Sequence, residues 1–309
     1  MSALASSAEE QPSCVQPVDL LESDGVSIVV PAYNEEDGCV PVIRELVATM
    51  EESGLDYEII VVDDGSTDGT SKKLCELEGA ITLVRHQRNM GYGASLKTGI
   101  RRAQHDLIAI TDADGTYPGK RIPELVRSMD YHAMVVGART GEKVRIPLVR
   151  RPAKWAIGKL ANYLSQTRIP DLNSGLRVMR RDVLNRFIRM LPAGFSFTTT
   201  ITLAMLTNGY PVRFEAIDYE HRAGRSKIRP IRDTLNFIQL IIRTVMYFEP
   251  LRIFLPLSAL LVLSSIAVLV LSIVMTGHVM DVTTVVLFVA AVQMLATGMI
   301  ADIVNKRLT

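Results

Sequence analysis

The sequence is poor in cysteine and almost balanced in charge, and each deficit excludes a class of protein. The three cysteines, Cys14, Cys39 and Cys75, lie far apart and form no CxxC pair, which argues against a disulfide framework or a zinc cluster and fits a reducing compartment. The five histidines show no HExxH spacing. With 34 basic and 33 acidic residues the net charge is +1, so overall charge gives no reason to expect a nucleic-acid partner.

Two common nucleotide-binding signatures are missing, and so is a signal peptide. The turn after the first predicted strand reads PAYNE at residues 31–35, without the glycines by which a GxGxxG motif admits a pyrophosphate. The phosphate-binding motif GxxxxGK[ST] is absent as well. Residues 1–24 have neither a basic start nor an apolar core, so we expect a mobile tail there.

The chain does contain a regular alternation of short apolar runs and helical segments. Runs rich in Val, Ile and Leu predict strands, and polar turns lead from them into helices. We expect a first helix from Asn34, which would cap it, to about residue 54, and strands at residues 26–31, 57–63, 80–85, 106–110, 132–138 and 211–220. The alternation predicts an α/β domain with a mainly parallel sheet and helices on both faces.

Acidic residues follow the fourth predicted strand, in the stretch from Thr111 to Gly115. Asp112 and Asp114 lie beyond the apolar run 107–110, at the sheet edge where open α/β folds bind ligands. Two carboxylates in one small volume repel each other unless a cation lies between them. Mg²⁺ or Mn²⁺, chelated in turn by substrate phosphates, would relieve that repulsion. Asp-Gly is also a common turn pair, so this stretch alone leaves a plain turn open.

Two long uncharged runs near the C-terminus predict a membrane hairpin. Residues 253–276 and 282–301 carry no charged side chain, and each is about as long as a helix that crosses a bilayer. Basic residues lie outside the pair, at Arg243, Arg252, Lys306 and Arg307. The positive-inside rule then places both ends in the cytoplasm and the short loop 277–281 on the far side. A hairpin buried in a protein core is the alternative.

Basic residues gather in two segments between the acidic stretch and the hairpin. One includes Arg151 and Lys154, and the other, at residues 221–229, includes Arg222 and Lys227. Such runs are often only a solvated surface. The second run lies just before residues 231–248, where apolar side chains recur at helical spacing. That segment predicts an amphipathic helix on the membrane surface.

Several motifs together resemble a known family. PAYNEE at 31–36, VDDGSTDGT at 62–70, N-x-G-x-G at 89–93 and D-A-D at 112–114 resemble the family 2 nucleotide-sugar glycosyltransferases with the GT-A fold. DLNSGLR at 171–177, HRAGRSK at 221–227 and the hairpin are similar to the polyprenyl-phosphate (dolichyl-phosphate) hexosyltransferases, which load mannose or glucose onto a lipid phosphate. The processive polysaccharide synthases carry Q-x-x-R-W instead. The single tryptophan here, Trp155, follows Lys154, which disfavours that branch.

The resemblance implies roles for individual residues. Asp114, with Asp112, would bind the metal that bridges the donor diphosphate. The residues implied for the nucleotide-sugar are Pro31, Tyr33, Glu35, Asp64, Gly93, Lys97, Asp112, Arg222 and Lys227, and those for the acceptor phosphate are Arg139, Arg151, Lys154 and Ser174. Asp171 would orient the acceptor cations, act as a base, or only cap the turn at 173–175. Mannose-specific members often read D-A-D-L-Q, whereas residues 115–117 here are Gly-Thr-Tyr, which leaves the donor sugar open.

These observations together predict an integral membrane enzyme. We expect a tail at 1–24, a GT-A domain at 25–229, an interfacial helix at 230–250 and a transmembrane hairpin at 251–309, with inverting transfer of a hexose from UDP-glucose or GDP-mannose to polyprenyl phosphate. The alternatives are transfer to a non-phosphorylated lipid such as diacylglycerol, with Asp171 as base, and an inactive membrane scaffold. Gln293 is polar within the second span and is a candidate for hydrogen bonding between helices or between subunits of a homo-oligomer.

Overall fold

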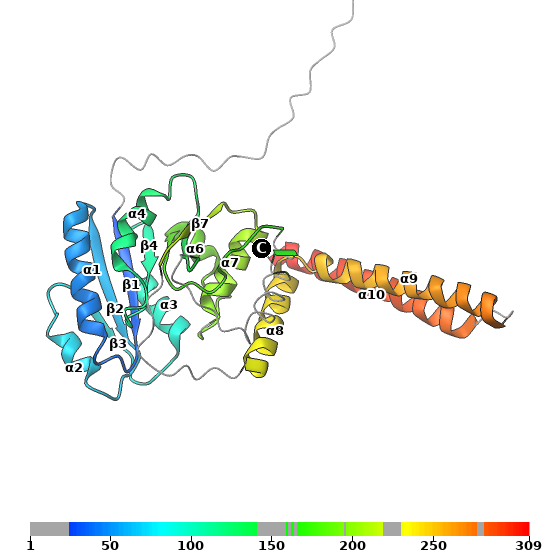
Figure 1. Cartoon of the computed structure of the whole chain (residues 1–309), viewed down its shortest axis with the longest axis horizontal. Coiled ribbons are helices and arrows are strands. Elements are labelled where there is room, and N and C mark those ends of the chain that lie inside the picture. Colours follow the sequence, from blue (N-terminus) through cyan, green and yellow to red (C-terminus); the bar gives the residue numbers. More distant parts are fainter. Residues whose placement is uncertain are drawn as a thin grey trace, which may run out of the picture.

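A seven-stranded sheet with helices on both faces forms the body of the protein, and two long helices extend away from it (Figure 1). The computed structural model describes residues 25–140, 159, 162–163, 166–194, 196–218, 230–276 and 281–308. The strands are β1 (Val26–Ala32), β2 (Tyr57–Asp63), β3 (Thr82–Arg85), β4 (Leu107–Ile110), β5 (Met134–Ala138), β6 (Arg177–Arg180) and β7 (Val212–Ala216), and their order in the sheet is β3-β2-β1-β4-β6-β5-β7.

The sheet is parallel except at β6, which is antiparallel to both of its neighbours, β4 and β5. The prediction of a mainly parallel sheet is therefore confirmed, with β6 as the antiparallel strand. The polar turn 171–175 lies at the edge where β5 ends, because Arg139 and Gly137 there hydrogen-bond to it. A strand that starts from that edge has to run in the opposite direction. The reversal brings the 171–175 turn beside the ends of β4 and β5.

Two layers of helices enclose the sheet. The first layer contains α1 (Cys39–Ser53), α2 (Thr70–Cys75), the 3-10 turn η1 (Gly119–Arg121) and α4 (Ile122–Arg127). The second contains α3 (Tyr92–Arg102), α6 (Arg181–Phe187) and α7 (Phe197–Thr207). Successive residues of β1 face opposite layers, since Ile28 and Val30 pack in the first core and Val29 in the second. Burial on both sides explains why the strands are continuous apolar runs.

The first helix begins later than the sequence predicts. Asn34 was expected to cap it, but α1 starts at Cys39, and Asn34 adopts a left-handed backbone conformation with φ 53°. Its side-chain oxygen accepts a hydrogen bond from the Thr67 N–H at 2.8 Å. The turn after β1 is therefore attached to the loop after β2. Residues 33–38 form part of the sheet edge and are not a helix.

The C-terminal part consists of α8 (Pro230–Phe248), α9 (Leu251–Thr276) and α10 (Asp281–Leu308). Helix α8 belongs to the body, because Ile241 and Val245 are fully buried and pack with Leu203 of α7 and Ile169. Helices α9 and α10 are long and apolar enough to cross a membrane over residues 251–275 and 282–304. They extend beyond the body (Figure 1), and 17% and 11% of their most apolar windows are buried. The two helices are therefore not buried in the core of this chain.

The two long helices bind each other through small polar side chains. The Ser258 hydroxyl donates to the carbonyl of Ala291 and the Ser265 hydroxyl to that of Thr284, both at 2.9 Å. Gly298 faces Phe254 so closely that a Cβ there would lie 2.5 Å from the Cβ of that side chain. Gln293, the candidate for such a contact, is exposed on α10. Ser258 and Ser265 thus supply hydrogen bonds between the two helices in the described part of the hairpin.

Candidate active site

Four strand ends and one turn meet at a single edge of the sheet. Strands β1, β2 and β4 are adjacent and parallel, so the residues that follow them lie together. Tyr33 is 43% exposed there, and the N–H of Glu35 donates to the Thr70 hydroxyl at 2.9 Å. Pro31 lies within β1, opposite Val62 of β2. The candidate donor residues from the first two strands are thus neighbours.

Asp64 is almost completely buried, and protein groups surround its carboxylate. It accepts the N–H groups of Met90 and Gly91 at 2.9 and 2.8 Å, and Nδ1 of His86 lies 2.7 Å from it. The carboxylate therefore holds the loop that carries the N-x-G-x-G motif against the end of β2. A role in binding base or ribose stays a prediction.

Gly93 and Lys97 are explained by the packing of the same loop. A side chain at Gly93 would collide with the carbonyl of Pro192 and the backbone of Ala193. Lys97 donates a hydrogen bond to the carbonyl of Leu191, and burial lowers its pKa. Both residues seat α3 on the 191–194 segment. In this arrangement Lys97 points at protein backbone, and its proposed contact with the nucleotide-sugar stays untested.

Asp112 and Asp114 follow β4, as the sequence predicts. The Tyr92 hydroxyl donates to one oxygen of Asp112 at 2.9 Å, and desolvation together with the charge of Asp112 raises the pKa of Tyr92 well above its usual value. Asp114 accepts the N–H and hydroxyl of Thr116 at 3.1 and 2.6 Å. The turn then continues through Gly115, with φ 72°. The Asp-Gly turn thus exists, and it presents both carboxylates at the sheet edge.

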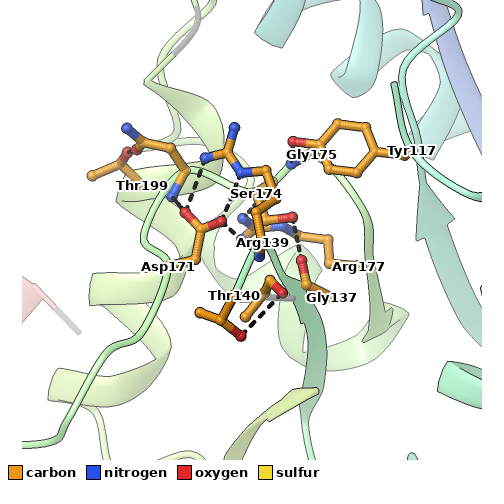
Figure 2. Close-up of polar contacts among 11 residues, drawn as sticks. Tyr117, Gly137, Arg139, Thr140, Asp171, Ser174, Gly175, Arg177 and Thr199 are labelled. Atoms are coloured by element: carbon orange, nitrogen blue, oxygen red, sulfur yellow. Dashed lines mark hydrogen bonds and ion pairs between the residues drawn. The ribbon is translucent and has the colours of Figure 1, made fainter. Parts of the chain in front are cut away.

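Arg139 and Asp171 form a closely matched ion pair on the other side of the site (Figure 2). The Arg139 side chain donates through Nε to one oxygen of Asp171 at 2.7 Å and through Nη2 to the other at 2.9 Å. The backbone N–H of Arg139 adds a third bond at 3.0 Å, and that of Asn173 a fourth at 3.1 Å. Burial alone would raise the pKa of Asp171, but Arg139 holds it below its usual 3.8.

Ser174 and Gly175 join this turn to its surroundings. The Ser174 hydroxyl is fully buried and donates to the carbonyl of Gly137 at the end of β5. The Gly175 N–H donates to the hydroxyl of buried Tyr117 at 2.7 Å (Figure 2). A Cβ at Gly175 would lie 2.9 Å from Oδ2 of Asp112, so the turn comes close to the carboxylate that follows β4. Ser174 thus faces protein, and its acceptor role stays a prediction.

Four of the predicted site residues lie outside the described part of the chain. They are the basic residues Arg151, Lys154, Arg222 and Lys227. The amphipathic helix expected to reach about residue 165 falls largely in the same undescribed region. Of the predicted cations, the described part of the chain therefore contains Arg139, at this edge, and Lys97, which contacts the backbone of Leu191.

The same segments match known protein families. A model of glycosyl transferase family 2 matches residues 27–188, just over half of the chain. The chain belongs to this family. A second model, the GtrB C-terminal hairpin, matches residues 249–306, the part that forms α9 and α10. The family 2 assignment expected from the motifs is confirmed.

Two curated relatives of this family 2 glycosyltransferase are named for prenyl-phosphate chemistry. The dodecaprenyl-phosphate galacturonate synthase of Rhizobium johnstonii is 27% identical over 305 residues, which cover 93% of this chain and 90% of that protein. The undecaprenyl-phosphate 4-deoxy-4-formamido-L-arabinose transferase of Pseudomonas fluorescens is 31% identical over 232 residues, covering 74% and 66%. Neither name includes glucose or mannose.

A solved structure shares the fold. The glucosyl-3-phosphoglycerate synthase of Mycobacterium tuberculosis, determined with Mn²⁺, UDP and phosphoglyceric acid, superposes with a TM-score of 0.55 at 19% identity, covering 72% of this chain and 78% of that one. At this identity the likeness concerns the fold alone. With the family match it confirms the predicted GT-A fold for the glycosyltransferase.

The carboxylates at the end of β4 are suitable ligands for a hard divalent cation. Asp112 and Asp114 supply carboxylate oxygens, which Mg²⁺ and Mn²⁺ prefer. Within the described residues no group of three or more His, Cys, Asp or Glu side chains is placed to hold a metal ion. Two carboxylates fit an ion that arrives with a diphosphate and takes its remaining ligands from phosphate and water.

Three residues of the site, buried Tyr117 and Arg177 and half-buried Tyr92, escape prediction from the sequence. Tyr92 contacts Asp112, Tyr117 contacts Gly175, and Arg177 reaches Ser174. Tyr92 lies in the N-x-G-x-G motif at 89–93 and Arg177 ends the DLNSGLR motif at 171–177, so those motifs were the available signal. Arg177 begins a four-residue strand in which charged side chains stand at both ends, R-V-M-R. Arginine is rarely fully buried unless its guanidinium has partners, so the contacts of Arg177 call for an explanation.

Proposed function

We propose that this protein is an inverting glycosyltransferase that moves a sugar from a nucleotide-sugar to polyprenyl phosphate at a membrane surface. The observation that carries the proposal is the Arg139–Asp171 pair. Both oxygens of Asp171 already accept hydrogen bonds from Arg139, and the pKa of Asp171 is lowered. A general base needs a pKa near the working pH. The pair therefore favours an acceptor that needs no base.

A lipid phosphate meets that requirement. Its second pKa is about 6, so the acceptor arrives already anionic. An alcohol such as diacylglycerol would have to lose a proton during transfer. The prenyl phosphates in the names of both relatives support the same choice, and the hairpin supports a lipid in the membrane.

The remaining work is to bring two anions together and to stabilise the leaving diphosphate. Asp112 and Asp114 would hold Mg²⁺ or Mn²⁺, which neutralises charge on the diphosphate when bound. Arg139 would draw the acceptor phosphate toward the anomeric carbon, since its planar guanidinium matches phosphate oxygens. The proposal keeps Arg151 and Lys154 on the acceptor side and Arg222 and Lys227 on the leaving-group side.

The proposed donor is a UDP- or GDP-linked sugar. The motif resemblance favours glucose or mannose, whereas the names of the two relatives contain galacturonate and a formamido-arabinose. All four sugars therefore belong in one donor panel. The proposed orientation places the catalytic domain and both termini in the cytoplasm, because Arg243, Arg252, Lys306 and Arg307 flank the spans.

The test uses the full chain in lipid nanodiscs with polyprenyl phosphate or diacylglycerol as acceptor, the donor panel, and Mg²⁺ or Mn²⁺. We expect product on polyprenyl phosphate with one donor. Product on diacylglycerol alone would overturn the proposal, and absence of product with every pair would favour the inactive scaffold. Asp114→Asn should abolish metal-dependent transfer without lowering the melting temperature. Asp130→Asn, at an exposed position, is the matched control and should transfer normally.

A further inference from the structure

Arg177 is a charged side chain buried in the centre of the molecule. It is fully buried at the start of β6, where it pairs with Ile110 of β4 and Val136 of β5. Two residues after Ile110 comes Asp112, and three residues after Val136 comes Arg139. Arg177 thus lies beneath the junction between the two sides of the site.

The guanidinium of Arg177 binds neutral groups. Nη1 donates to the carbonyl of Thr198 at 3.0 Å and to the hydroxyl of Thr202 at 2.8 Å, and Nη2 donates to the carbonyl of Ser174. None of the ion pairs within 4 Å among the described residues includes Arg177, and its Nε has no hydrogen-bond partner there. Burial lowers the pKa of Arg177 to about 10, so the group is charged at neutral pH.

Packing alone does not explain a guanidinium at this position. An apolar side chain of similar volume avoids the desolvation of a buried charge and is often the more stable choice. Arginine differs in that one planar group can donate to several acceptors in fixed directions. Arg177 uses this to join α7, through Thr198 and Thr202, to the 171–175 turn, through Ser174.

The turn that Arg177 holds carries Asp171. Ser174 donates in turn to Gly137, and Arg139, two residues further on, binds Asp171 through side chain and backbone (Figure 2). We propose that Arg177 is a positioning residue, which fixes the 171–175 turn on α7 and thereby sets the Asp171–Arg139 pair for the acceptor phosphate. This inference rests on the proposed function for its acceptor.

Helix α7 also connects this turn with the membrane side. Leu203 of α7 packs with Ile241 and Val245 of α8, and Leu172 of the turn and Ile253 of α9 pack against the same cluster. Arg177 therefore holds the turn to a helix whose other contacts lead to the hairpin. The position of the Asp171–Arg139 pair is in this way fixed relative to the hairpin, which is the part of the protein that meets the lipid.

Three variants test the role. Arg177→Met keeps the length and removes the charge, Arg177→Lys keeps the charge and removes the fork, and Thr202→Val removes one acceptor of the guanidinium. Arg180→Met is the matched control, because Arg180 lies on the same strand and donates to the carbonyls of Asp130 and His132. We expect Arg177→Met to lower kcat/KM for polyprenyl phosphate about 100-fold, and Arg177→Lys about tenfold, with nucleotide affinity changed less than about threefold. Arg180→Met should change neither.

Equal losses in the acceptor and donor parameters, or a lower melting temperature with unchanged kcat/KM per folded enzyme, would overturn the proposal. If Arg177→Met does not fold, Arg177→Lys and Thr202→Val give the same comparison. Hydrogen exchange needs no substrate: amides of residues 137–139 and 171–176 should exchange faster in Arg177→Lys than in wild type, and unchanged exchange would contradict the link. If wild type makes no prenyl-linked product, the proposed function fails, while faster exchange still supports the link.

Discussion

Asp171 is held so completely by its neighbours that its protonation state should contribute to stability. Because its pKa in the folded protein lies below the usual 3.8, the carboxylate contributes stability above that value and loses it as pH falls through the folded pKa. Above pH 4 we expect Asp171→Asn to lower the free energy of unfolding by about 1–3 kcal/mol. The difference from wild type should shrink below pH 4.

Chemical unfolding in detergent between pH 3 and pH 7 measures this effect. Asp130→Asn, at an exposed position, should give a small difference that does not change with pH. A constant gap between wild type and Asp171→Asn over the whole range would show that the carboxylate charge is not what stabilises the turn.

Tyr92 offers a second test at the scale of one residue. Its hydroxyl fixes one oxygen of Asp112, and groups that orient a ligand side chain typically affect metal affinity or activity by about 10- to 100-fold. Tyr92→Phe should therefore weaken the Mn²⁺-dependent binding of the donor nucleotide by about tenfold and leave metal-free binding unchanged. Calorimetric titration measures both. Tyr131→Phe, at a position 61% exposed, serves as control, and equal weakening with and without metal would contradict the role.

At the scale of elements, the sequence predicts the strands that bury both faces and fails where tertiary contacts decide. β1, β2 and β4 are continuous apolar runs, and they lie where periodicity places them. The strand β6 is short and begins with a buried arginine. The polar turn at 171–177 indicates that a strand or a helix follows, but the direction of the strand is not visible in the pattern. The predicted start of α1 is wrong because the Asn34 side chain accepts a hydrogen bond from the N–H of Thr67, 33 residues away.

The site follows the same division. Asp112 and Asp114 sit at the end of an apolar strand, which local sequence predicts. Arg139 and Asp171 are 32 residues apart in the sequence. Arg177 contacts Thr198 of α7, a helix that follows it in the sequence and packs on the sheet. Motifs thus locate functional residues, and the partners that orient those residues come from the fold.

Helix α8 gives a prediction at this scale. The sequence suggests a helix lying on a membrane surface, yet Ile241 is fully buried against α7. Ile241→Ala should lower the free energy of unfolding by about 2–5 kcal/mol through lost contacts and a cavity. Met246→Ala on the same helix, where the side chain is 41% exposed, should cost less than about 1 kcal/mol. A loss at Ile241 as small as that at Met246 in detergent unfolding would show that α8 is not part of the folded body.

At the scale of the whole molecule, the catalytic edge and the hairpin are joined through one apolar cluster. Ile169 lies just before the 171–175 turn, Leu172 lies within that turn, and Ile253 lies near the start of α9. In the proposed function, this cluster would fix the acceptor side of the glycosyltransferase relative to the lipid. The hairpin would then set the distance between membrane and site as well as anchor the protein.

The orientation of the hairpin follows from charge and can be measured. Arg243, Arg252, Lys306 and Arg307 lie outside the two spans, and the connecting residues 277–281 include no Lys or Arg. Basic residues close to a span stay on the cytoplasmic side, so position 278 should face the opposite compartment. In a background with the three native cysteines replaced, His278→Cys should react with a membrane-impermeant maleimide in right-side-out vesicles. Tyr131→Cys, on the catalytic domain, should react in inverted vesicles alone. The reverse pattern would place the catalytic domain outside, and the cytoplasmic pool of nucleotide-sugars could then not supply this site.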